Sequence, residues 1–334
     1  MVNDNSLKFG KGKDMKTVSD SILCILHEEK KEGKIALRIC GTNYILMEYI
    51  PTGLDLKRRI HLQWVETMLR EMQPEGLLEI TGGVCSLLIS YDYEKISADQ
   101  LAEQIKKAEE MAQTHEGEPL PSRLVNLPIA FHDSATKECI ERYMQGIRGE
   151  APYLPDNMEF LAQCNHLPNA KAVEDIVLST EYMVLGLGDV YMGAPCAVPL
   201  NEKARINAPK YNPARIYTPE GAVGIGGTFM AIYSTQSPGG YQLVGRTSPI
   251  WNPSQTGENF KEAPWLLRPF DRIQFYRVTE EKLEQIRTDV KAGRHRYSIQ
   301  NDEFRMDGTM SSKQEAASGR KGLFARFFGK EKQV

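Results

Sequence analysis

The sequence predicts an α+β chain of two domains, a small α/β sandwich followed by a closed, mostly β domain. The length of 334 residues exceeds what one hydrophobic core usually organises. Strand-like and helix-like segments alternate up to about residue 118. After Tyr182, glycine and proline are frequent between short apolar runs, which is typical of a barrel or sandwich with many turns.

Residues 20–118 contain the segments of the sandwich. Two stretches, 34–50 and 76–93, each read as a pair of strands around a glycine turn. Two others, 55–72 and 97–113, carry apolar side chains at helical spacing behind a residue that can cap a helix. We expect both helices to cover one face of the sheet.

Residues 119–180 are predicted to hold a linker and a helical insert. The polar, proline-containing start suits a linker, and 124–133 reads as a strand. Three helical patterns follow, at 134–149, 155–167 and 172–180.

The β domain is expected at 181–298, between regions of different character. Residues 1–19 form a polar segment that we expect to be flexible, and 299–334 a polar tail that we expect to be disordered. The tail ends in phenylalanines interleaved with Lys and Arg. A solvated basic end, a docking peptide for a partner's groove and a weak anionic-membrane anchor are all compatible with this end.

Composition excludes several kinds of partner. The formal net charge of -3 gives no overall attraction for nucleic acid. No apolar run approaches the roughly 18 residues that span a bilayer, and the polar N-terminus lacks the apolar core of a signal peptide. The cysteines show no paired spacing, as expected for thiols in a reducing compartment. These observations predict a cytoplasmic protein without an integral membrane segment.

Standard catalytic motifs are absent from the sequence. It contains no P-loop, no dinucleotide fingerprint in a strand-to-helix context, no G-x-S-x-G elbow and no H-E-x-x-H. The histidines are scattered singly, so no metal site is predicted. A self-sufficient hydrolase is therefore disfavoured.

Oriented polar residues and glycines instead gather in the β half. Two arginines, a lysine and amide side chains suit a small planar anion, because guanidinium matches carboxylate geometry and glycine lets backbone N–H groups approach. Strand alternation predicts that Gln242 and Arg246 point the same way. The competing interpretation is that the arginines pair with Asp or Glu at a barrel rim while the glycines only turn corners. The candidates are Lys210, Asn212, Arg215, Tyr241, Gln242, Arg246, Gly226, Gly227, Gly239 and Gly240.

Several separated motifs resemble one carboxyltransferase family, which includes the Kip inhibitor, a component of bacterial 5-oxoprolinase and half of the carboxyltransferase region of urea carboxylase. The motifs are "LGLGDVYMGAP", "PEGAVGIGGTFMAIY" and "SPGGYQLVGRT", in that order. The insert "LPIAFHDSATKECIERYMQGIRGEAPYLPDNMEFLAQCN" and "KYNPARIYTPE" resemble the urea carboxylase half most closely. The similarity covers about residues 20–290.

The resemblance implies a cyclophilin-like β-barrel behind the N-terminal domain, and a site shared with a second, KipA-like carboxyltransferase subunit. The chain shows neither ATP-grasp features nor a biotinylation sequence. We therefore expect the biotin carboxylase, which uses ATP, and the biotin carboxyl carrier protein to be separate polypeptides.

The reaction that the resemblance implies is transfer of CO2 from carboxybiotin to an amide-type nitrogen, without a metal. It makes Arg215, Arg246 and Lys210 the expected stabilisers of negative charge. Asn212, Tyr241, Gln242 and Asp189 would bind the substrate, although Asp189 is also a candidate for a structural ion pair. The two glycine pairs, Gly226–Gly227 and Gly239–Gly240, would approach biotin.

Three function classes remain compatible with the sequence. The first is a subunit of a biotin-dependent urea or guanidine carboxylase. The second is the corresponding component of an ATP-dependent 5-oxoprolinase, which needs no biotin carrier. The third is a Kip-type inhibitor that binds a kinase, against which the helical insert counts.

Overall fold

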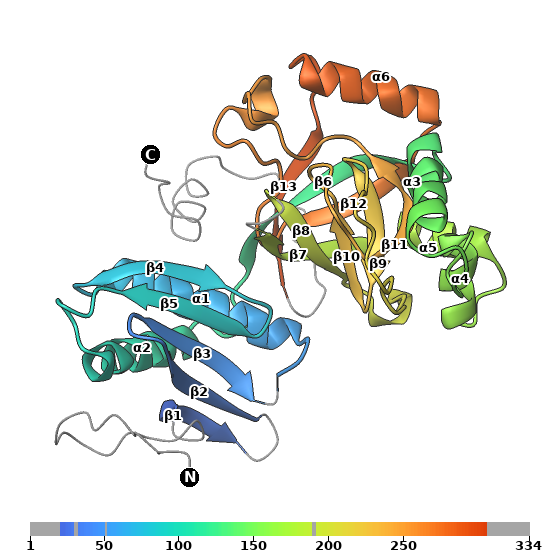
Figure 1. Cartoon of the computed structure of the whole chain (residues 1–334). Helices are drawn as coiled ribbons and strands as arrows, with labels where there is room; N and C mark the ends of the chain where they lie inside the picture. The colour runs from blue at the N-terminus through green and yellow to red at the C-terminus, as the bar shows by residue number, and fades with distance from the viewer. Residues whose placement is uncertain (1–20, 30–32, 51, 189–191, 306–334) are drawn as a thin grey trace, which may run out of the picture. The chain divides into compact units, whose positions relative to one another are not determined.

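The computed structural model describes residues 21–29, 33–50, 52–188 and 192–305, which form two compact units divided after Glu116 (Figure 1). The predicted flexible segment 1–19 lies outside the described residues, as does the tail from residue 306. Each described unit has one sheet. The α+β fold class predicted from the sequence is confirmed.

The N-terminal unit is a five-stranded antiparallel sheet with two helices on one face (Figure 1). The strands lie in the order β1-β2-β3-β5-β4. Their bounds are β1 (Ile22–Glu29), β2 (Gly33–Cys40), β3 (Tyr44–Ile50), β4 (Leu77–Gly82) and β5 (Ser86–Tyr91).

Both predicted helices of this unit begin behind the expected caps. Helix α1 (Leu56–Met72) follows Asp55, whose carboxylate accepts from the backbone N–H of Lys57 at 2.9 Å. Helix α2 (Ala98–Gln113) follows Ser97, which forms a reciprocal capping box with Gln100. The two helices pack against each other and bury a continuous apolar layer against the sheet.

The C-terminal unit is a closed seven-stranded barrel. The strands lie in the order β11-β9-β10-β8-β7-β12-β6, and pairing of β11 with β6 closes the ring. All neighbours are antiparallel except β6 and β12. The barrel strands are β6 (Leu120–Ala130), β7 (Glu181–Gly188), β8 (Ala194–Pro199), β9 (Ala222–Gly226), β10 (Phe229–Ile232), β11 (Gln242–Thr247) and β12 (Arg272–Arg277).

Two boundaries differ from those expected. Strand β6 belongs to the barrel, so the region predicted as linker and helical insert begins with a barrel strand. Strand β13 (Ser298–Phe304) pairs with β6 along its whole length, so the sheet continues into the region expected to be a disordered tail. The polar composition of β13 suggested disorder, because its exposed residues are polar. One of its polar residues nevertheless has a structural role, since Asp302 accepts from Arg272 at 2.6 Å.

The three predicted insert helices are present beside the barrel (Figure 1). Helices α3 (Ser134–Gly146) and α4 (Asn157–Cys164) contact β11, and α5 (Ala170–Ser179) contacts β12. Helix α6 (Glu280–Lys291) contacts β6. Short 3₁₀ helices occupy Glu202–Ala204 and Glu258–Phe260.

No helix within the described ranges is both long and apolar enough to cross a bilayer.

Candidate functional site

The polar stretch 207–215, called the site loop below, runs beside glycine-containing parts of the barrel. Its Ala208 forms an antiparallel bridge with Gly227, with N···O distances of 3.2 and 2.8 Å. Farther along, Tyr211 N–H donates to Gly240 O at 2.7 Å, and Arg215 exchanges backbone bonds of 2.9 and 3.0 Å with Gly239. The loop that carries Lys210, Asn212 and Arg215 is thus aligned with the predicted glycines.

Arg215 is a buried cation at the end of this loop, with an exposed fraction of 1%. Its Nη1 donates to the carbonyl of Tyr241 at 2.8 Å, and its Nε to Thr218 Oγ1 at 3.3 Å. The guanidinium lies 4.3 Å from the ring centroid of Tyr211, a cation–π contact. The buried Nη2, which carries two N–H groups, meets no acceptor at hydrogen-bonding geometry within the described part of the chain. The Cys139 thiol and the Tyr211 hydroxyl are the polar groups that interact with this guanidinium.

Gln242 is completely buried at the start of β11. Its Nε2 donates to Pro209 O of the site loop at 2.7 Å. Its Oε1 has no partner among the residues that the structure describes. A buried polar atom without a partner costs about 1–3 kcal/mol of folding free energy. The Nη2 atom of Arg215 and the Oε1 atom of Gln242 are therefore candidates for hydrogen bonds to a ligand.

Tyr241 directly precedes Gln242 in the sequence, and its ring packs on the barrel backbone at Gly226. A Cβ at Gly226 would lie 2.4 Å from Tyr241 Cδ1, so only glycine admits the ring there. Lys210 Nζ lies 5.0 Å from the Tyr241 ring centroid. Burial raises the pKa of Tyr241 to about 12, which keeps the hydroxyl neutral.

The predicted glycines have different structural roles. A Cβ at Gly239 would lie 2.2 Å from the hydroxyl of Tyr233, so this glycine, like Gly226, makes room for a tyrosine of the protein itself. Gly227 has a φ of 60°, and no atom lies within 4 Å of where its Cβ would be. Gly240 would tolerate a Cβ, whose nearest neighbour is Lys210 Cβ at 3.5 Å. The backbone is therefore open beside Gly227.

The prediction that Gln242 and Arg246 share a face of the strand is wrong. A β-bulge at Val244 shifts the register of β11 on β9. Gln242 opposes Ile225, whereas Arg246 opposes Ala222, three residues away, so the two side chains leave opposite faces.

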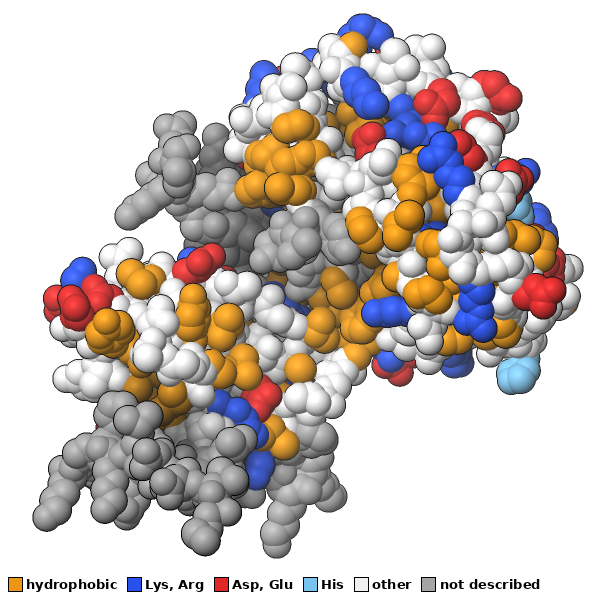
Figure 2. Space-filling view, in the orientation of Figure 1, with side chains coloured by type: hydrophobic (Ala, Val, Ile, Leu, Met, Phe, Trp, Pro, Cys, Tyr) orange, Lys and Arg blue, Asp and Glu red, His pale blue; other side chains and the backbone are white. Residues whose placement is uncertain are grey.

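Arg246 instead takes part in ion pairs with α6. Its Nη1 lies 2.7 Å from Glu284 Oε1, and its Nε donates to Glu220 O at 3.0 Å. Arg287 binds the Glu220 carboxylate at 3.2 Å in the same group. Figure 2 shows acidic and basic side chains intermixed over this part of the barrel unit. This arrangement matches the alternative interpretation of an arginine paired at the rim.

The two remaining predicted residues, Asn212 and Asp189, are less informative. Asn212 is exposed, and Asp189 lies outside the described residues. Asp133 is buried and caps α3 through the N–H of Thr136 at 3.1 Å, and burial raises its carboxyl pKa. No group of three or more His, Cys, Asp or Glu within the described residues is placed to bind a metal ion.

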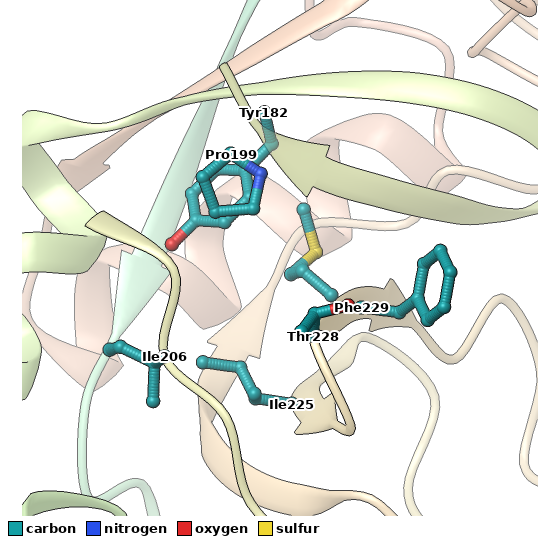
Figure 3. Close-up of a pocket in the computed structure, with 7 residues that line it drawn as sticks. Tyr182, Pro199, Ile206, Ile225, Thr228 and Phe229 are labelled. Carbon is teal, nitrogen blue, oxygen red and sulfur yellow. The ribbon is translucent and has the colours of Figure 1, made fainter. Parts of the chain in front are cut away.

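A small apolar pocket lies inside the barrel, where Gln242 is paired with Ile225 (Figure 3). Figure 3 shows Ile206 and Ile225 across the pocket from Tyr182 and Pro199. Its volume of about 10 Å³ is close to the space of one water molecule. This pocket is thus too small to hold a substrate in this conformation.

Residues 35–260 match the model of the carboxyltransferase domain, subdomains C and D. The chain belongs to this carboxyltransferase family. The family prediction made from the glycine-rich motifs is thereby confirmed.

The relatives of this carboxyltransferase domain are mostly much longer proteins. It is 41% identical over 289 residues to the urea amidolyase of Lachancea kluyveri, covering 86% of this chain and 16% of that protein. The crystal structure of the Kluyveromyces lactis urea carboxylase matches 90% of this chain with a TM-score of 0.79 and 38% identity, over 27% of that chain. A component of the 5-oxoprolinase of Bacillus subtilis is 28% identical over 63% of this chain and 80% of that protein.

Sequence reasoning missed the side chains that hold the site loop from outside. Tyr143, Tyr153, Asn157 and Asn165 all bond to it or to its tyrosine. Nothing local in the sequence linked them to a loop whose bonded residues lie 42 to 70 positions farther along the chain. The "KYNPAR" motif, residues 210–215, lies within the site loop. It indicated the loop but not the side chains that hold it.

Proposed function

We propose that this chain supplies one half of the carboxyltransferase site of a biotin-dependent urea- or guanidine-type carboxylase. The observation that supports this most directly is that Arg215 Nη2 and Gln242 Oε1 are buried polar atoms without a hydrogen-bond partner among the described residues. Arg215 is bonded to the carbonyl of Tyr241, the residue before Gln242. Urea presents a C=O and an N–H group, which are complementary to the Nη2 donor and the Oε1 acceptor, whereas guanidine has no oxygen and matches only the Gln242 acceptor.

Each residue has a physical role in this proposal. Arg215 polarises the acceptor's oxygen, and Gln242 orients its N–H group. Lys210 adds positive charge where a carboxylate forms, and the Tyr241 ring excludes water. Arg246 is left out because its guanidinium is already paired with Glu284.

Biotin would fit at the open backbone beside Gly227, where no atom lies within 4 Å of a Cβ position. When bound, carboxylated biotin supplies the CO2 that the acceptor nitrogen takes up. The chain's own contribution is positioning and charge stabilisation, the effects that matter most when no covalent intermediate with the protein is needed.

The proposal includes partners. We expect a KipA-like carboxyltransferase subunit to complete the site, a biotin carboxyl carrier protein to deliver the biotin, and a biotin carboxylase to use ATP. The long relatives, of which this chain matches 15% to 24%, support the expectation that further domains or subunits take part.

The test is reconstitution with the polypeptides that copurify with the tagged chain, followed by assays of ATP-dependent bicarbonate fixation with urea and with guanidine. Inhibition by avidin is expected. Arg215→Lys and Gln242→Met should each reduce kcat/KM about 10²-fold, the usual effect of removing one well-placed hydrogen-bonding group. Arg246→Gln, which changes a nearby arginine outside the proposed site, should change it less than about threefold.

Two results would contradict the proposal. ATP-dependent opening of 5-oxoproline by an avidin-insensitive complex would favour the 5-oxoprolinase class, to which the Bacillus subtilis match belongs. Equal losses from Arg215→Lys and Arg246→Gln would mean that these buried polar atoms are not the binding groups.

A further inference from the structure

We infer that the helical insert acts as a clamp that positions the site loop, and that Tyr143, Tyr153, Asn157 and Asn165 are positioning residues. The inference rests on the proposed function only for its effect on catalysis. The claim that the insert restricts the motion of residues 207–215 concerns the loop itself, and it can be tested without any substrate.

Asn157, at the start of α4, joins the insert to the site loop and to strand β11. Its Nδ2 donates to Tyr153 O at 2.8 Å, and its Oδ1 accepts from the Tyr211 hydroxyl at 2.9 Å. The same Oδ1 accepts from the N–H of Leu243 at 2.9 Å. The Asn157 side chain, which is 1% exposed, therefore fixes two groups: Tyr211, whose ring lies under Arg215, and the beginning of strand β11 next to Gln242.

Two tyrosines of the insert hold the next two residues of the loop. Tyr143 donates to Pro213 O at 2.9 Å. The Tyr153 hydroxyl lies 3.2 Å from both the N and the O of Asn212, and 3.1 Å from the Tyr143 hydroxyl. Both tyrosine rings also pack on Tyr211, with centroid distances of 4.8 and 4.1 Å.

The beginning of the loop is held from the far end of α4. Asn165 and Asn207 form a reciprocal pair, with Asn165 Nδ2 donating to Asn207 O at 3.0 Å and Asn207 N–H donating to Asn165 Oδ1 at 2.8 Å. Arg148 adds a bond to Asn212 O at 2.7 Å. The insert thus contacts residues at the start and in the middle of the segment that carries Lys210 and Arg215.

These contacts matter because the loop has no regular secondary structure of its own. Bridges at Ala208 and Arg215 join its two ends to the barrel. Between them, Pro209 and Tyr211 are bonded to the barrel, whereas the backbone of Asn212 and Pro213 is held by bonds from the insert. Catalytic groups tolerate misplacement of about 1 Å poorly, so loosening the clamp should reduce turnover without removing a group that touches substrate.

The experiment removes the hydroxyl from tyrosines of the insert and, as a control, from a buried tyrosine elsewhere that makes the same kind of hydrogen bond. Tyr143→Phe and Tyr153→Phe, singly and together, remove clamp bonds. Tyr297→Phe is the matched control, because that buried hydroxyl also donates to a proline carbonyl, Pro249 O, but away from the insert. Hydrogen exchange of the 207–215 peptide is followed by mass spectrometry on the full chain.

The clamp predicts faster exchange in 207–215 by about three- to tenfold for each hydroxyl removed, the effect of one hydrogen bond on local opening, and no change there for Tyr297→Phe. In the reconstituted enzyme, kcat should fall by a similar factor with little change in KM. Unchanged exchange in the double variant would overturn the clamp whatever the activity. Faster exchange with unchanged kcat would overturn its role in positioning, whereas absence of all transferase activity in the wild type would overturn the proposed function alone.

Discussion

At the scale of single residues, the glycines that identify the motif are explained by tyrosines. Gly226 and Gly239 face Tyr241 and Tyr233 at distances that no Cβ allows. The notion that such glycines only let a ligand approach is therefore incomplete. They also let a large aromatic side chain lie flat on the barrel.

This explanation predicts the behaviour of Gly239→Ala. The added methyl would overlap the Tyr233 ring, so we expect a loss of about 1–3 kcal/mol of unfolding free energy, as is usual for overpacking. Tyr233→Leu in the same chain should recover part of the loss, because it vacates the space. A double-mutant cycle by denaturant unfolding measures this coupling, and strictly additive losses would contradict the contact.

His295 predicts a dependence of stability on pH. Burial lowers its imidazole pKa below the ordinary value of 6.5, and its ring lies edge-on to Tyr297 at 4.7 Å. Asp289 opposes this shift and Lys282 adds to it. Because the folded state binds the proton less readily than the unfolded state, stability is lost as the pH falls through 6.5 towards the folded pKa.

The variant His295→Gln should therefore lose less stability than the wild type as the pH is lowered from about one unit above to about one unit below the ordinary histidine pKa. Urea unfolding at several pH values measures the two slopes. A steeper loss in the variant would reverse the sign of the predicted shift.

At the scale of elements, the sequence was informative wherever periodicity and caps act locally. Helices α1 and α2 begin where Asp55 and Ser97 predicted, because capping is a matter of three or four residues. Strand β1 was not predicted, since its continuous apolar run does not distinguish strand from helix. The bulge at Val244 was also missed, because it depends on pairing with β9, and that single residue moved Arg246 out of the predicted site.

Strand β13 gives the prediction at this scale. Ending the chain after Tyr297 would remove the strand and take Asp302 from Arg272, whose exposed fraction is 1%. Arg272 keeps its ion pair with Glu181 at 2.8 Å, so the loss costs less than the roughly 3–5 kcal/mol of an unpaired buried charge. Because the pairing of β13 with β6 is lost as well, we expect a fall in melting temperature. A chain that ends after Arg305 keeps β13 and should melt like the full chain, and equal melting of both truncations would contradict the role of β13.

At the scale of the whole molecule, the division after Glu116 corresponds to separate cores. The main apolar cluster of the barrel unit contains residues from Val125 to Tyr297 and none from the N-terminal unit. Chain length alone led to the expectation of two cores, since it sets how much surface one core must bury, and the structure divides into two compact units. The site, in contrast, depends on a loop, a strand and an insert that meet only in the fold, so its residue types could be predicted but its supports could not.

Independent cores predict that residues 117–334 fold alone. We expect the fragment to unfold cooperatively and to protect the backbone amides of β6 and β12 from exchange as the full chain does. Circular dichroism and hydrogen exchange measure both properties. A fragment with helical signal but no protected amides would show that the barrel needs the first unit.

The pairing of β6 with late strands has a consequence for biosynthesis. Ala130 pairs with Arg246, Leu124 with Arg272 and Leu120 with Phe304, so a strand made early finds its neighbours only after about 120 to 180 further residues have been translated. The first unit can condense while the ribosome is still translating the insert, but β6 must wait with its apolar face uncovered. A nascent chain of this kind needs protection for most of its translation time, and a stalled or truncated product would expose a ready partner for aggregation.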